Sequence, residues 1–151
     1  MADSKFKKHG GPAGRQAGLR FEPLDHPSDV GIIAYGQSRK DVFENAAYGM
    51  FSLMADLSKV NPKQSFKITV TADDPEALLV NWLNELIYRQ DAKKLLFSKF
   101  KINQLTATRL EAVVAGEKID PKRHSLSRGV KAATYNQLQI GSNQAKIVFD
   151  V

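Results

Sequence analysis

Two short acidic segments, one near each end of the 151-residue chain, carry residues whose types and spacing could do chemistry. Residues 25–29 (DHPSD) place an imidazole between two carboxylates, just before an apolar run. The last residues, Phe149, Asp150 and Val151, place a side-chain carboxylate next to the residue that bears the α-carboxylate. Two carboxylates on adjacent residues repel each other unless a cation lies beside them. Both segments are therefore candidates for cation binding.

Asp29, Asp150 and the α-carboxylate of Val151 would together form an oxygen cluster of the kind that hard divalent cations prefer. Such a site favours Ca²⁺ or Mg²⁺ and disfavours zinc, because only His26 could supply nitrogen. Two alternatives stay open: residues 25–29 form an ordinary polar turn, and a C-terminal strand frays into water. Spacing along the chain does not itself bring residues 29 and 150 together.

Most other signatures of enzyme chemistry are absent from the sequence. There is no P-loop, G-x-G-x-x-G, G-x-S-x-G or H-E-x-x-H motif, and the three histidines are scattered. The chain has no cysteine, which excludes a disulfide scaffold and a thiol nucleophile and is typical of a reducing cytosol. No apolar run approaches the roughly 18 residues that a membrane-spanning helix needs. We therefore expect a cytoplasmic protein without a membrane partner.

The positive charge is concentrated at the N-terminus. The net charge is +6, and residues 1–20 hold five basic residues against one acidic residue. We expect residues 1–18 to be a disordered basic leader, because their Gly-, Pro- and Lys-rich composition cannot bury enough apolar surface. Residues 19–151 fit a single domain. A basic arm of this kind could contact RNA phosphates, so a stand-alone RNA-binding protein is one alternative. Further candidates for this role are the lysines Lys93, Lys94, Lys99 and Lys101.

The hydrophobic periodicity predicts an α+β domain in which two helices pack against a largely antiparallel β-sheet system. One helix should begin after Ser38 as N-cap, and its apolar stripe runs to Leu57. The second should begin at Asp74-Pro75 and bury Trp82. A long loop is expected at 116–128. Strands are expected at 19–24, 30–35, 66–72, 95–102, 105–115, 130–140 and 145–151.

Six blocks of the sequence, in order, resemble the motifs of the archease family. The resemblance covers about residues 20–151 and leaves the leader out. Six ordered blocks are far more specific than a single motif. The blocks are HPSDVGI (26–32) with AYG (34–36); FENAA (43–47) with Met50, Phe51 and Met54; LVNWLNELIY (79–88); GEK (116–118) with Asp120, Pro121 and His124; VKA (130–132) with Thr134 and Tyr135; and VFDV (148–151).

Archeases are accessory proteins of the RtcB-type tRNA-splicing RNA ligase. The resemblance therefore implies a non-catalytic activator that promotes guanylylation of the ligase histidine and multiple turnover, and that meets RNA through the ligase. It implies a bound divalent metal, Ca²⁺ first, with Mg²⁺ or Mn²⁺ as alternatives, held by Asp29, Asp150 and Val151. It also implies Lys118 and His26 as contacts with the partner.

The sequence departs from the family pattern at a few positions, and one further alternative is open. Asn136 stands where a histidine is often found, so any role of that imidazole is missing here. Pro27-Ser28 and Arg89-Gln90 also differ from the usual residues. A metal-dependent phosphohydrolase would need a general base, and His26 is the single candidate for that role.

Overall fold

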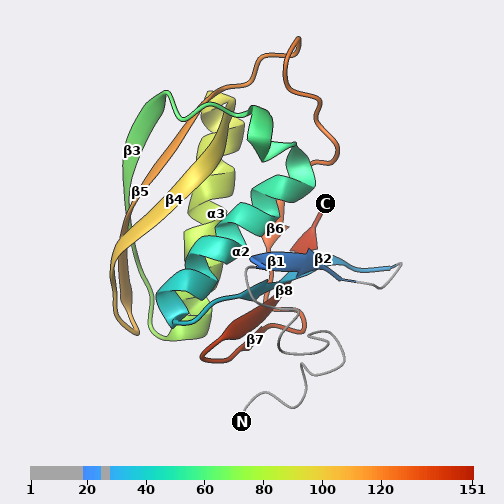
Figure 1. The fold of residues 1–151 in the computed structure, drawn as a ribbon. Helices are drawn as coiled ribbons and strands as arrows, with labels where there is room; N and C mark the ends of the chain where they lie inside the picture. The colour runs from blue at the N-terminus through green and yellow to red at the C-terminus, as the bar shows by residue number, and fades with distance from the viewer. Residues whose placement is uncertain (1–18, 25–27) are drawn as a thin grey trace.

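The computed structural model describes residues 19–24 and 28–151, which form two antiparallel sheets with two helices between them (Figure 1). The predicted α+β fold class is confirmed. The elements in chain order are β1 Phe21–Pro23, β2 Val30–Tyr35, α2 Arg39–Met54, the 3₁₀ turn η3 Leu57–Lys59, β3 Gln64–Thr71, α3 Pro75–Lys93, β4 Leu95–Leu105, β5 Arg109–Lys118, β6 Ala132–Ala133, β7 Gln139–Ile140 and β8 Gln144–Asp150.

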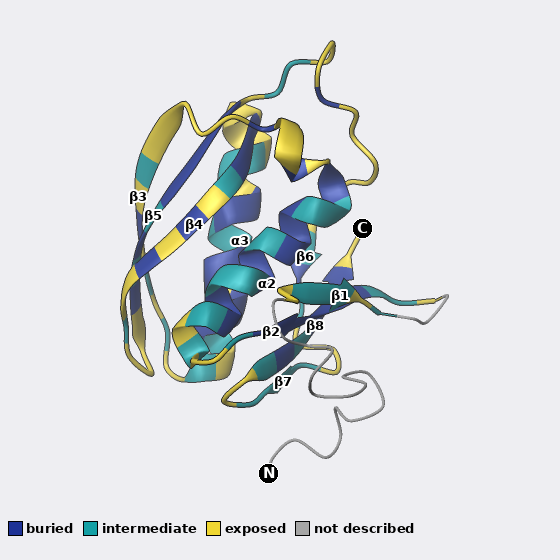
Figure 2. Ribbon diagram, viewed as in Figure 1, coloured by how far each residue is buried: buried dark blue, intermediate teal, exposed yellow. Residues whose placement is uncertain are grey.

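The larger sheet has the strand order β1-β2-β8-β6, and β7 pairs with β8 further along that strand. The smaller sheet has the order β3-β5-β4. Helix α2 contacts β1, β2 and β8 of the larger sheet and β4 of the smaller one, while α3 contacts β6 and all three strands of the smaller sheet. The helices thus form a layer between the two sheets, and both helices carry many buried residues (Figure 2).

Both helices begin where the sequence predicts. Ser38 accepts a hydrogen bond from Asp41 N at 3.2 Å, and Asp74 accepts one from Ala77 N at 2.8 Å. Each cap satisfies a backbone donor of the first helical turn. Trp82 is fully buried in α3, and its indole N–H donates to the carbonyl oxygen of Phe43 in α2 at 2.9 Å. The indole therefore joins the two helices and satisfies its own polar atom.

The predicted loop at 116–128 starts too early. Strand β5 continues through Gly116 and Glu117 to Lys118 and pairs with β4 over this stretch. A Cβ built on Gly116 would lie 1.8 Å from the carbonyl oxygen of Leu96, next to a register shift between Phe97 and Lys99. Glycine is required here by a close approach of two strands, so it does not mark a turn.

The predicted strand at 130–140 is wrong in its middle. The stretch contains two strands of two residues each, β6 and β7. They pair with opposite ends of β8, and the chain turns between them. Gln137 lies in this turn with φ 57°, in the left-handed region. The alternation of polar and apolar residues persists because both short strands border the same sheet.

Candidate functional site

The strand pairing brings together the two acidic segments from opposite ends of the chain. Strand β2 pairs antiparallel with β8 from Tyr35 and Gln144 to Val30 and Phe149. Continued by one residue beyond that last pair, the same register would set Asp29 opposite Asp150. Residues directly opposite in an antiparallel pair project from the same face of the sheet. The fold thus juxtaposes two carboxylates separated by most of the sequence.

The end of β8 is held on both sides, because this strand is central in its sheet. Lys131 N donates to the carbonyl oxygen of Asp150 at 2.8 Å, and Thr134 Oγ1 donates to the carbonyl oxygen of Val148 at 2.8 Å. Strand β6 pairs with Asp150 and Phe149 on the side away from β2. A strand that is bonded along both edges does not fray as an edge strand would. The described structure therefore favours a fixed position for the Asp150 backbone.

Asp29 is half-buried and lies within reach of a polar side chain from the turn between β6 and β7. Gln137 Nε2 donates to Asp29 Oδ2 at 3.4 Å, and Lys146 Nζ donates to Gln137 Oε1 at 2.9 Å. Asp150 is exposed, as is the terminal residue Val151, which is 49% exposed. The carboxylates of Asp29 and Asp150 offer oxygen atoms, which suit a hard cation better than zinc.

The described residues supply two carboxylates to this point. Within residues 19–24 and 28–151, no group of three or more His, Cys, Asp or Glu side chains is arranged so that it could hold a metal ion. A third protein ligand would have to be the carboxylate of Val151, as the sequence predicts. Asp25 and His26 lie outside the described residues, so the predicted role of His26 in partner binding stays a prediction.

Lys118 is not in a loop, contrary to the expectation for residues 116–118. It is the exposed last residue of β5 and pairs with Leu95 of β4. It therefore belongs to the smaller sheet, whereas Asp29 and Asp150 border the larger one. The structure does not place these three predicted site residues on one sheet.

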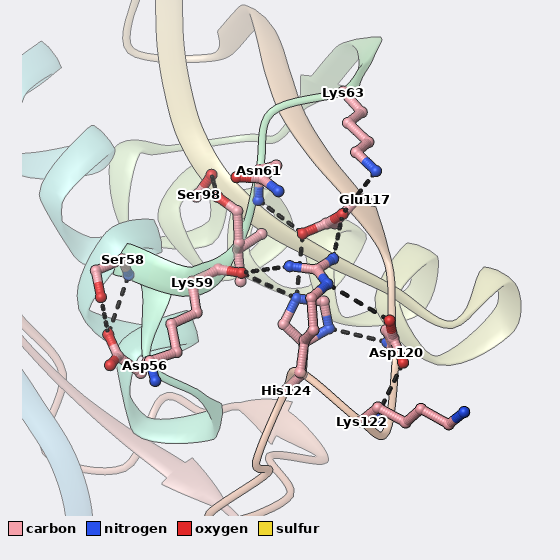
Figure 3. A network of polar contacts seen from close by, with 12 residues as sticks. Asp56, Ser58, Lys59, Asn61, Lys63, Ser98, Glu117, Asp120, Lys122 and His124 are labelled. Carbon is pink, nitrogen blue, oxygen red and sulfur yellow. Dashed lines mark hydrogen bonds and ion pairs between the residues drawn. The ribbon is translucent and has the colours of Figure 1, made fainter.

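Next to Lys118 lies a buried polar cluster that the sequence analysis missed (Figure 3). Glu117 and His124 are the buried charged or polar residues of the described core, at 3% and 4% exposure. Glu117 Oε1 accepts from Arg123 Nη2 at 2.7 Å, and Glu117 Oε2 accepts from Asn61 N at 2.7 Å. The Arg123 guanidinium and the Asn61 N–H lower the pKa of Glu117 to about 2.

The hydrogen bonds of His124 define its tautomer. Its Nδ1 accepts from Asp120 N at 2.9 Å, so the proton of the neutral ring resides on Nε2. Nε2 lies 3.1 Å from Glu117 Oε2 and 3.1 Å from the carbonyl oxygen of Lys59. The ring thus donates toward both oxygen atoms and is satisfied without being charged.

This cluster ties the loop after β5 to the segment between α2 and β3. Arg123 Nη1 donates to the carbonyl oxygen of Lys59 at 3.2 Å, in addition to its ion pair with Glu117. All the polar atoms named here have partners within the protein, which is typical of a structural network. Strand alternation could not have revealed this cluster, because it sets Glu117 on the face opposite Leu110, Ala112 and Val114; the segments that carry Asn61, Arg123 and His124 bury its side chain.

Two antiparallel sheets around two helices, with opposed carboxylates at the end of the β2–β8 pair, define a small α+β protein with a candidate cation site. The family model described as the archease protein family matches residues 21–151. A protein archease from Methanosarcina acetivorans is 35% identical over 89% of this chain and 97% of its own length. One from Sulfurisphaera tokodaii is 41% identical over 80% of this chain and 88% of its own length.

Solved structures agree with this assignment. The solution structure of Methanobacterium thermoautotrophicum protein 1598 has a TM-score of 0.73 and 33% identity, covering 87% of this chain and 99% of that one. An archease from Thermotoga maritima, described as a possible chaperone, shares the fold at a TM-score of 0.54 and 15% identity, covering 86% of this chain and 96% of that one. The chain belongs to the archease family. Among the helices of the described residues, none combines the length and apolar character needed to cross a bilayer.

Proposed function

We propose that the protein is a non-catalytic activator of the RtcB-type RNA ligase in tRNA splicing and RNA repair, and that it works in the cytoplasm. It promotes guanylylation of the ligase histidine and multiple turnover, and it meets RNA through the ligase. Membership of the archease family supports the proposal. The observation that supports its mechanistic part is the register of the β2–β8 pair, which ends at Val30 and Phe149, the residues that adjoin Asp29 and Asp150.

Asp29, Asp150 and the carboxylate of Val151 would hold a divalent cation, with Ca²⁺ favoured over Mg²⁺ or Mn²⁺. An all-oxygen donor set with room for water and backbone carbonyls suits the flexible coordination of Ca²⁺. When bound, such an ion supplies positive charge that attracts phosphate oxygens.

The remaining residues around the site position these ligands. Gln137 donates to Asp29 and accepts from Lys146, and this pair of hydrogen bonds restricts the rotation of the Asp29 side chain. The Lys131 N–H fixes the backbone of Asp150. Lys118 and His26 are the proposed contacts with the ligase.

The test is a ligation assay with the cognate ligase that follows the guanylylated enzyme over repeated turnovers. Asp29→Asn and Asp150→Asn should each reduce the stimulation by about 10-fold or more, because loss of ligand organisation weakens metal sites on that scale. A tag added after Val151 should have the same effect. Asp73→Asn, an exposed carboxylate in the turn before α3, is the matched control and should stimulate fully.

Each failure has a distinct meaning. If the wild-type protein does not stimulate the ligase, the proposed function is wrong. If the wild type stimulates and the folded Asp29→Asn and Asp150→Asn variants do so equally, the metal role is wrong. Turnover of a phosphoester without the ligase would instead favour a phosphohydrolase.

A further inference from the structure

A groove runs between the C-terminal half of α3 and the segment at 128–132, and it ends at the C-terminal residue. It has a volume of about 830 Å³, and its walls include Ile87 and Tyr88 of α3, Val130 and Val151. At Arg128 and Gly129 it meets a second hollow of about 200 Å³, whose walls include Leu126. The two hollows together follow one side of the segment at 126–132.

Exposed apolar side chains are concentrated along this groove. Within the described part of the chain, the large apolar residues that are exposed are Leu19, Tyr88, Leu126, Tyr135 and Val151. Three of these line the two hollows: Tyr88 at 65% exposure, Leu126 at 53% and Val151 at 49%. Contiguous apolar surface of this kind marks a contact surface more often than a freely solvated one.

The rim of the groove carries cations without acidic partners. Arg128 and Lys131 are exposed, and neither forms an ion pair with any residue that the structure describes. By contrast, Arg89, Arg109 and Arg123 are each paired with a carboxylate. The acidic groups of the residues that line the groove are Asp91, which lies 3.9 Å from Lys94 Nζ, and the α-carboxylate of Val151. The groove therefore combines apolar wall residues with two cations that form no ion pair among the described residues.

We propose that this groove receives an acidic segment of a partner polypeptide. An apolar side chain of the segment packs against Tyr88, Ile87 and Val151, and its carboxylates lie at Arg128 and Lys131. Tyr and Arg are enriched at the centres of protein interfaces, whereas single-stranded RNA sites need several stacking rings along a basic track. The inference rests on the proposed function in one respect, because it takes the RNA ligase as the partner.

The position of Val151 connects this groove with the candidate cation site. Val151 lines the groove and directly follows Asp150, and Lys131 of the rim donates its N–H to the Asp150 carbonyl oxygen. A partner segment seated here would contact the C-terminal residue that follows Asp150. Under this proposal, contacts in the groove supply the free energy that binds the partner, and the carboxylates remain free to hold the cation.

Gly129 offers a way to block the groove without disturbing the fold. It lines both hollows, and a Cβ built on it would meet no atom within 4 Å. Gly129→Trp therefore adds a large side chain at a residue that lines both hollows, with no clash at its Cβ. A second variant, Arg128→Glu, reverses a charge of the rim at a residue that lines both hollows. The matched control is Lys67→Glu, an exposed lysine on β3 of the other sheet.

The experiment measures binding of the full-length protein to the cognate ligase, with thermal unfolding and Ca²⁺ affinity of each variant as structural readouts. Both groove variants should bind the ligase about tenfold more weakly or worse, with unfolding and Ca²⁺ affinity unchanged. The control should bind like the wild type. Wild-type binding should also weaken with rising salt, because the rim contacts are ionic.

Three outcomes would overturn the inference. If the groove variants bind and stimulate the ligase like the wild type, the groove is not the docking surface, while the proposed function stands. If the wild type neither binds nor stimulates the ligase, the proposed function fails and the inference fails with it. If a labelled 20-nucleotide RNA binds the wild type and competes with the ligase, and the rim variant loses that RNA, the groove is a nucleic-acid site.

Discussion

Glu117 illustrates how a single carboxylate can be stabilised inside a small protein. Folding removes it from water, and two short hydrogen bonds, from Arg123 and from the Asn61 N–H, replace the lost hydration. A buried carboxylate with such partners is kept in its charged form. The stability of the segment that follows β5 should therefore depend on this one side chain.

We predict that Glu117→Gln lowers the free energy of unfolding by about 2 kcal/mol, because the charge that holds Arg123 and the Asn61 N–H is lost. Glu111→Gln is the matched control in the same strand, where the carboxylate pairs with Arg109 at an exposed position. That variant should cost less than about 1 kcal/mol. Urea unfolding of the two proteins measures the difference, and equal small losses would show that the cluster contributes little.

The same carboxylate predicts a pH dependence with a defined sign. The folded-state pKa of Glu117 is lowered from 4.5 to about 2, so its stabilising contribution is complete above pH 4.5. The contribution is lost as the pH falls from about 4.5 toward 2. The difference in unfolding free energy between the wild type and Glu117→Gln should be constant from pH 7 to 5 and shrink below that. A difference that stays constant down to pH 3 would contradict the assignment.

At the scale of elements, the N-termini of the helices were predictable, while helix α2 ends at Met54, before the predicted Leu57, and the ends of strands were also less predictable. Ser38 and Asp74 cap their helices as their residue types indicate. Capping was predictable because it depends only on a short polar side chain and the apolar repeat that directly follows it. Gly116 has two meanings, a turn or a close approach between strands, and the sequence does not distinguish them. A shared site for Asp29 and Asp150 was predictable as a possibility, but the β2–β8 register that brings their neighbours Val30 and Phe149 together depends on the whole sheet.

Gly116 and Gly129 provide a matched pair for testing the close approach in β5. Gly116→Ala should destabilise the protein by about 3 kcal/mol, because its Cβ would lie 1.8 Å from the Leu96 carbonyl oxygen and the strands must separate. Gly129→Ala should change stability by no more than about 1 kcal/mol, since its Cβ meets no atom within 4 Å. Thermal unfolding of both variants decides the point, and a neutral Gly116→Ala would mean that β4 and β5 are farther apart than described.

At the scale of the whole molecule, the β2–β8 pair joins segments more than 100 residues apart. A cation held by Asp29 and Asp150 would therefore act on the global unfolding transition, because unfolding must separate its ligands. Excess Ca²⁺ at about 100 times its dissociation constant should raise the unfolding free energy of the wild type by about 2.7 kcal/mol. Asp150→Asn should remove this response, and without Ca²⁺ it should be as stable as the wild type or slightly more so, because a repulsion between carboxylates is relieved. Asp73→Asn should keep the full response in the same thermal unfolding experiment. A Ca²⁺-induced shift that survives Asp150→Asn would place the ion elsewhere and separate the acidic ends of the chain from metal binding.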